Sequence, residues 1–155
     1  MSKKDEFIAY AESQCGKKGD KFWRSVGSAK NMPWSTTFIT SCAKQTGICN
    51  KVLPNTSNAN SYIKKGRNDV SSPGKFLPNN NLPQSGDIVM MGTDENNIDR
   101  VGIVRSYDLN TGTMKVIMGD STKSGHNRSI VSMFSYDPTY NEIVGYFRPD
   151  WDGIE

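Results

Sequence analysis

Histidine and cysteine are scarce in this sequence. The chain has a single histidine, His126, so any mechanism that needs two imidazoles is excluded. Its three cysteines, Cys15, Cys42 and Cys49, are an odd number without metal-ligand spacing. This pattern predicts reduced thiols and argues against a disulfide framework or a zinc site. No acidic segment has the alternating oxygen-ligand spacing of a calcium loop, so we predict no metal and no cofactor.

Long apolar runs are also absent. No run of about 18 apolar residues exists, which excludes a transmembrane helix at the level of the sequence. Residues 1–10 carry charges but lack an apolar signal-peptide core, so we expect no secretory signal and synthesis in the cytoplasm. The net charge is only +3 and the basic residues are scattered. This balance suits weak attraction to an anionic polymer such as a cell wall, and it does not indicate nucleic-acid or membrane binding.

The apolar residues that are present suffice for one core. They make up 35% of 155 residues, which predicts a single domain over 1–155. The pattern predicts a helix capped by Ser2 and ending near Gln14, a second over 35–45 and a short third over 58–65. Residues 68–86 are predicted to be a loop. Strands are predicted over 87–91, 100–106, 114–118, 129–132 and 143–147, with a hairpin turn at 108–112. Helices followed by antiparallel strands indicate an α+β domain.

Six segments, in order, resemble the CHAP family, the cysteine- and histidine-dependent amidohydrolases and peptidases. They lie at 11–16, 32–47, 83–89, 99–104, 117–121 and 143–149. Members are papain-like bacterial and phage enzymes that cut amide bonds in peptidoglycan. The resemblance covers almost the whole chain. It implies a papain-like fold in which N-terminal helices pack on an antiparallel sheet of five to six strands.

The catalytic positions implied by this resemblance are altered. The family's cysteine follows a Pro-Trp pair, and Ser35 stands there. The family's histidine precedes Val-Gly-Ile-Val, and Arg100 stands there. Only Asp120 could serve as the third residue, because Met118 occupies the other candidate position. An alcohol needs a general base, and arginine stays protonated, so the resemblance implies a degraded site and a pseudoenzyme.

Several of these residues also have simpler interpretations. In the simpler interpretation, Ser35 caps a helix and has no other role, and His126 is expected in a solvated turn. Arg100 is predicted to form an ion pair with Asp120 across the old active-site floor, with both side chains directed towards Ser35. Asp99 is expected on the opposite face, because neighbouring strand residues alternate. The resemblance also implies substrate-binding positions, which are Trp34, Met118 and Ser121.

Three functional interpretations follow from the resemblance. The leading one is a non-catalytic module of a phage or mobile element that binds a cell-wall peptide or a protein partner. Such a module would be a virion component or would be released to the wall at lysis. The first alternative is an active endolysin-type amidase or endopeptidase, seen in an inactivated form in which Ser35 replaces cysteine. The second is a purely structural virion or tail protein.

Overall fold

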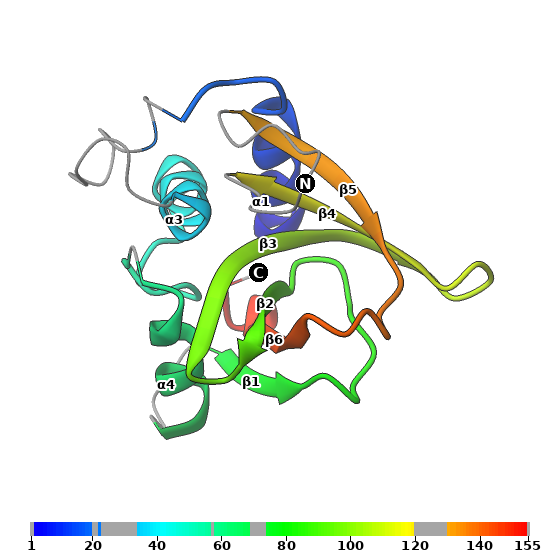
Figure 1. Ribbon diagram of the computed structural model, residues 1–155. Coiled ribbons are helices and arrows are strands. Elements are labelled where there is room, and N and C mark those ends of the chain that lie inside the picture. Colours follow the sequence, from blue (N-terminus) through cyan, green and yellow to red (C-terminus); the bar gives the residue numbers. More distant parts are fainter. Residues whose placement is uncertain are drawn as a thin grey trace.

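Three helices precede six strands in the part of the chain that the structure describes (Figure 1). The computed structural model describes residues 2–19, 22, 34–56, 58–68, 74–119 and 130–154. The helices are α1 (Lys3–Ser13), α3 (Ser35–Gln45) and α4 (Asn60–Asn68). The strands are β1 (Gly74–Pro78), β2 (Ile88–Asp94), β3 (Asn97–Asp108), β4 (Thr113–Gly119), β5 (Val131–Tyr136) and β6 (Ile143–Pro149), and a 3-10 helix, η1 (Trp151–Ile154), follows. The predicted α+β class is confirmed.

The strands form one antiparallel sheet in the order β1-β6-β2-β3-β4-β5. The predicted loop over 68–86 is partly wrong, because β1 lies within it and pairs with β6 from Gly74 opposite Pro149 to Pro78 opposite Gly145. Pro78 is tolerated here because β1 is an edge strand of the sheet. A side chain at Gly74 would meet the ring of Phe147 at 2.5 Å, so the close strand approach requires glycine.

The two faces of the sheet carry separate apolar clusters. The helix face, which packs on the helices, includes Phe7, Ala11, Phe38, Ile88, Met90, Val101 and Ile103. The outer face, directed away from the helices, carries Val89, Met91, Val104, Met114, Val116, Met118, Tyr136, Ile143 and Tyr146. Alternate residues of β2 and β3 therefore belong to alternate clusters, as strand geometry requires. Because both clusters are buried, a side chain of either face reaches a solvent-shielded environment.

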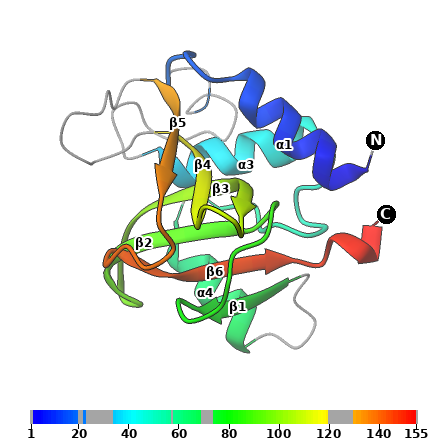
Figure 2. The ribbon, with the colours of Figure 1, turned by 90° about the vertical axis from the view of Figure 1, so that its right-hand side faces the viewer.

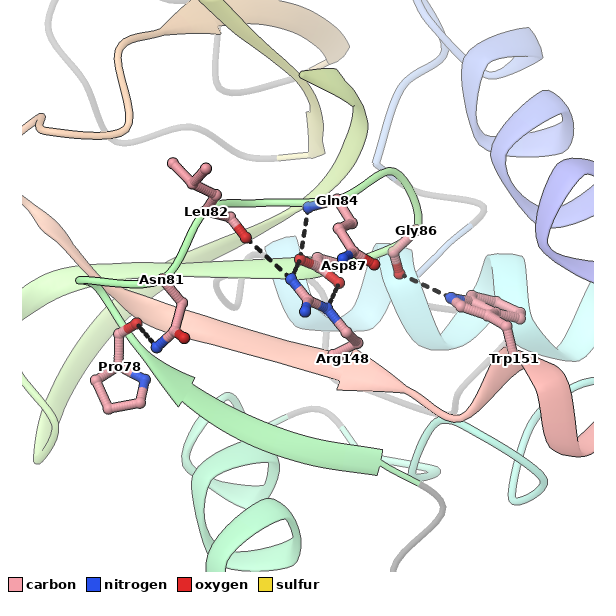
Figure 3. A network of polar contacts seen from close by, with 8 residues as sticks. All are labelled: Pro78, Asn81, Leu82, Gln84, Gly86, Asp87, Arg148 and Trp151. Atoms are coloured by element: carbon pink, nitrogen blue, oxygen red, sulfur yellow. Dashed lines mark hydrogen bonds and ion pairs between the residues drawn. The ribbon is translucent and has the colours of Figure 1, made fainter. Parts of the chain in front are cut away.

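A buried ion pair joins the start of β2 to the end of β6 (Figure 3). Arg148 donates from Nε to Asp87 Oδ1 and from Nη2 to Asp87 Oδ2, each at 2.9 Å. Asp87 is 1% exposed and also accepts from the backbone N–H of Gln84, while Arg148 Nη2 donates to the Leu82 carbonyl. Hydrogen bonding to Asp87 raises the pKa of Arg148. The pair fixes the segment before β2 against β6.

The first helix lies against the last turn of the described chain. The rings of Phe7 in α1 and Trp151 in η1 have centroids 5.6 Å apart. Trp151 also donates from Nε1 to the Gly86 carbonyl at 3.3 Å. Figure 2 places both chain ends on the same side of the molecule. None of the described helices combines the length and apolar character that a membrane span needs.

Candidate functional site

Ser35 is the first residue of α3, and the expectation that it caps this helix is wrong. The N-cap is Trp34, whose φ of −127° is not helical and whose carbonyl accepts from Phe38 N at 2.9 Å. The Ser35 hydroxyl instead accepts a hydrogen bond from the backbone N–H of Val101 at 3.2 Å. Ser35 is 5% exposed. The start of α3 is thus held against β3 next to Arg100, so the two positions that the resemblance marks as catalytic are neighbours.

Arg100 is a buried arginine at the edge of a β-bulge. In the pairing of β2 with β3, Met91 lies opposite Arg100 and Gly92 opposite Ile98, which leaves Asp99 as an extra residue. The bulge interrupts the alternation of side chains, so the expectation that Asp99 points away from Arg100 is wrong. Arg100 Nη1 donates to Asp99 Oδ1 at 2.8 Å.

Arg100 has a second carboxylate partner that the sequence did not reveal. Its Nη1 also donates to Glu142 Oε1 at 3.3 Å, and the Tyr140 hydroxyl donates to Glu142 Oε2. Burial lowers the pKa of Arg100, but Glu142 and then Asp99 outweigh burial and raise it overall. Glu142 lies just before β6, and its proximity to Arg100 depends on the long-range pairing of β6 with β2. No local sequence pattern signals this pairing.

The Arg100 side chain belongs to the outer face. Its charge acts on Tyr136 and opposes the rise that burial gives the Tyr136 pKa. Tyr136 is part of the outer-face cluster, whereas Val101 packs towards the helices. Ser35 meets the strand from the helix face. The expectation that Arg100 projects towards Ser35 is therefore wrong: the positions are adjacent along β3, but the two side chains approach it from opposite faces.

Trp34 and Met118 are packing residues. Trp34 is 3% exposed and stacks on Phe22 with ring centroids 5.6 Å apart and planes 7° from parallel. Its ring also lies where a side chain at Gly119 would stand. Met118 has no exposed surface and belongs to the outer-face cluster. Their burial does not support the substrate contacts that the resemblance implied.

Three sequence-predicted residues lie outside the described part of the chain: Asp120, Ser121 and His126. The Arg100–Asp120 ion pair therefore stays a prediction. A buried guanidinium needs a carboxylate within reach, and Asp99 and Glu142 supply it. Within the described ranges no group of three metal-ligating side chains comes together.

Two open hollows lie at the other end of the sheet. One, of about 500 Å³, is lined mainly by the start of β1, the Asp87–Arg148 pair and η1. The other, of about 600 Å³, lies by the 82–85 segment and the end of β3. Asp87 precedes Ile88, which pairs with Ile103, whereas Arg100 pairs with Met91 in the middle of β2. Neither hollow belongs to the site around Ser35 and Arg100.

Comparisons with known proteins bear on the fold. No protein-family model and no curated protein sequence matches the chain. The crystal structure of Ly7917 aligns with a TM-score of 0.61 and 16% identity, over 97% of this chain and 63% of that chain. Ly7917 with the hydrolyzing product of MDP aligns at 0.59 and 14%, over 95% and 63%. The wild-type endolysin LysIME-EF1 aligns at 0.61 and 13%, over 97% and 65%. This chain thus spans less than two thirds of the length of each neighbour, and the shared α+β architecture agrees with the papain-like fold expected from the sequence.

Proposed function

We propose that the chain is a CHAP-type, peptidoglycan-binding protein without hydrolytic activity. The observation that carries this proposal is the environment of Ser35. Its hydroxyl accepts a hydrogen bond from the Val101 N–H, and no acidic or basic side chain among the described residues hydrogen-bonds to it. A serine nucleophile must pass its proton to a base, and Arg100, whose pKa is raised, remains protonated. The likeness of fold to the endolysin LysIME-EF1 supports the wall as the binding target.

The experiment measures wall binding and wall lysis on one sample. Purified peptidoglycan is incubated with the full chain, and the bound fraction and the loss of turbidity are both recorded. We expect saturable binding and no lysis above the buffer control. An active endolysin serves as the positive control for lysis. Clear lysis by the unmodified chain contradicts the catalytic half of the proposal, and absence of wall binding contradicts the other half.

The variant Ser35→Cys tests the reason for inactivity. A thiol at the start of α3 gains thiolate character from the helix N-terminus. It still has no acid for the leaving amine, so we expect no turnover. Ser41→Cys, also in α3 and buried, is the matched control for a new thiol. Reaction with a small thiol reagent shows whether each new thiol can be reached. Lysis by Ser35→Cys with Arg100 unchanged would mean that another base acts on residue 35.

A further inference from the structure

Strand β5 forms one border of the sheet, with β4 as its neighbour (Figure 1). The other side of its first residue is occupied: Gly16 N donates to the Val131 carbonyl at 2.8 Å, and Val131 N donates to the Lys17 carbonyl at 3.0 Å. The main-chain groups of Val131 therefore point away from β4. Alternate residues of a strand direct these groups to the same side, so those of Met133 and Ser135 also point away from β4. Within the described ranges, no hydrogen bond reaches either residue on that side.

This open edge lacks the features that keep exposed strands from pairing with another chain. Charged residues, proline and β-bulges serve this purpose in natural sheets. The opposite border strand, β1, contains Lys75 and Pro78, and α4 packs so closely on it that a side chain at Gly66 would stand 2.4 Å from the Phe76 nitrogen. The β5 sequence Val-Ser-Met-Phe-Ser-Tyr has no charge and no proline, and its register with β4 is unbroken. The β5 edge is therefore suited to accept a further strand.

The open part of this edge is symmetric. It begins after Val131, whose main chain is already bonded, and it ends with Tyr136, where the strand ends and a turn follows. The stretch 132–136 is thus centred on Phe134. A two-fold axis at its centre would superpose the stretch on an identical one that runs in the opposite direction, so the shape of the edge fits a second copy of itself.

We propose that two copies of this chain pair through their β5 edges, antiparallel and related by a two-fold axis at Phe134. Met133 of each copy then lies opposite Ser135 of the other, and each of these pairs exchanges both of its N–H···O=C hydrogen bonds. The two half-buried Phe134 side chains lie directly opposite each other and form a cross-strand aromatic pair. The pairing uses only β5 and its flanks, so it goes beyond the proposed wall binding and does not rest on it.

Charges at the two ends of the open stretch are complementary in this arrangement. Lys17 and Lys18 lie beside the start of β5 and are exposed, and Asp137, which follows β5, is exposed as well. Antiparallel pairing about residue 134 brings residue 137 of one copy opposite residue 131 of the other. Asp137 of each copy therefore lies near the two lysines of the other copy, at both ends of the interface. This contact favours a second copy running antiparallel to the first.

Sedimentation velocity of the unmodified full chain tests the association. The weight-average mass should rise from 17.2 kDa towards twice that value as the protein concentration is raised to about 1 mM, because an interface of this small size is weak. Association should stop at two copies, since each copy offers one unprotected edge. A mass that stays at 17.2 kDa throughout overturns the proposal. Masses that grow beyond two copies overturn it as well.

Backbone amide hydrogen exchange, measured by nuclear magnetic resonance, locates the interface. In a single copy the N–H groups of Met133 and Ser135 face solvent, whereas those of Ser132 and Phe134 face β4. The first two should exchange quickly in a dilute sample and slowly in a concentrated one, and the other two should be protected in both. A dimer in which Met133 and Ser135 still exchange quickly overturns the assignment to β5. This measurement needs only the unmodified chain.

The variant Ser135→Pro removes one outward N–H from each copy and leaves the bonds to β4 in place. Half of the main-chain bonds across the interface are lost or distorted, so the dissociation constant should rise about tenfold or more. Ser135→Thr is the matched control, because it keeps the N–H and should associate as the unmodified chain does. Circular dichroism confirms that both variants are folded. An unchanged dissociation constant for folded Ser135→Pro overturns the proposal, and if this variant does not fold, the exchange measurement decides.

The variant Asp137→Asn tests the charge contact. It keeps an acceptor for the Thr139 N–H, which bonds to Asp137 Oδ1 at 2.9 Å, so the turn after β5 is preserved. The lost pairs are exposed, and the dissociation constant should rise by about 2–30-fold. Asp108→Asn is the matched control, since Asp108 is also exposed and accepts from a backbone N–H in a turn away from the β5 edge, and it should leave the constant unchanged. Equal constants for Asp137→Asn and the unmodified chain overturn the charge contact.

Discussion

Replacing Asp87 by asparagine tests how much the buried pair with Arg148 stabilises the fold. Asp87→Asn removes the negative charge and one acceptor for Arg148 but keeps an oxygen for the Gln84 N–H. Two charge-assisted hydrogen bonds are weakened or lost. Removing one partner of a buried pair costs about 3–5 kcal/mol. Arg148 is 28% exposed, so water recovers part of the loss, and we expect the lower end, about 3 kcal/mol.

Urea unfolding followed by circular dichroism measures this loss directly. The same change should lower Tm by about 6–12 °C, since 1 kcal/mol corresponds to about 2–4 °C in a domain of this size. Asp152→Asn is the matched control: Asp152 is exposed in η1, so its loss should stay within about 0.5 kcal/mol. In combination with Arg148→Met, the two losses should be less than additive. A loss below about 1 kcal/mol for Asp87→Asn would refute the reasoning.

Three further outcomes follow from the structure. Gly119→Ala places a methyl group 2.5 Å from Cζ3 of Trp34 and should lower the free energy of unfolding, measured with urea, by about 1–3 kcal/mol. When Trp34→Leu is added, the double variant should lose less stability than the two single variants added together. Burial raises the pKa of Tyr146 to about 12. The free energy of unfolding should therefore be constant with respect to this group below a pH of about 10 and should fall by about 2–3 kcal/mol as pH rises through the folded pKa. A phenolate absorbance that titrates fully near a pH of about 10 in the folded protein would contradict this. Arg100→Met and Glu142→Gln should be coupled in a double-mutant cycle, by about 1 kcal/mol because Glu142 is half exposed, and additive losses would argue against their ion pair.

Most helices and strands could be predicted from the sequence, because the residue patterns that indicate them lie within the elements themselves. Helix α3 begins and ends at the residues that its apolar spacing predicts, 35 and 45. The segments that predict β2, β3, β4 and β6 are rich in valine, isoleucine and methionine or aromatic residues. Strand β1 is not predicted, because the surrounding residues are rich in proline and asparagine and indicate a loop. Its partner β6 is also distant in sequence. β5 extends to Tyr136, beyond its predicted end at 132, because residues 132–134 are only partly buried and Ser135 is exposed, so no continuous apolar run marks this part of the strand.

The motifs place residues 35 and 100 close together but do not predict how their side chains are oriented. The motifs identify residues 35 and 100, and the hydrogen bond between Ser35 and Val101 makes them neighbours. Strand alternation then fails at Asp99, because a bulge adds one residue there. Which face Arg100 occupies, and its pairing with Glu142, depend on the register of three strands. Register is a tertiary property, so no pattern within one segment could supply it.

The contact between Phe7 and Trp151 means that the order of the elements along the chain could be changed without changing the fold. Because α1 and η1 touch, a short peptide could link the two ends of the molecule. The turn between β3 and β4 is exposed at Leu109 and Asn110, where the backbone could be opened without breaking a strand. A circular permutant opened there would have β4 as its first strand and β3 as its last, with every antiparallel pairing kept. The β3–β4 hairpin would then be closed by the two ends of the new chain, and its folding would depend on contacts distant in sequence where the natural order makes them local.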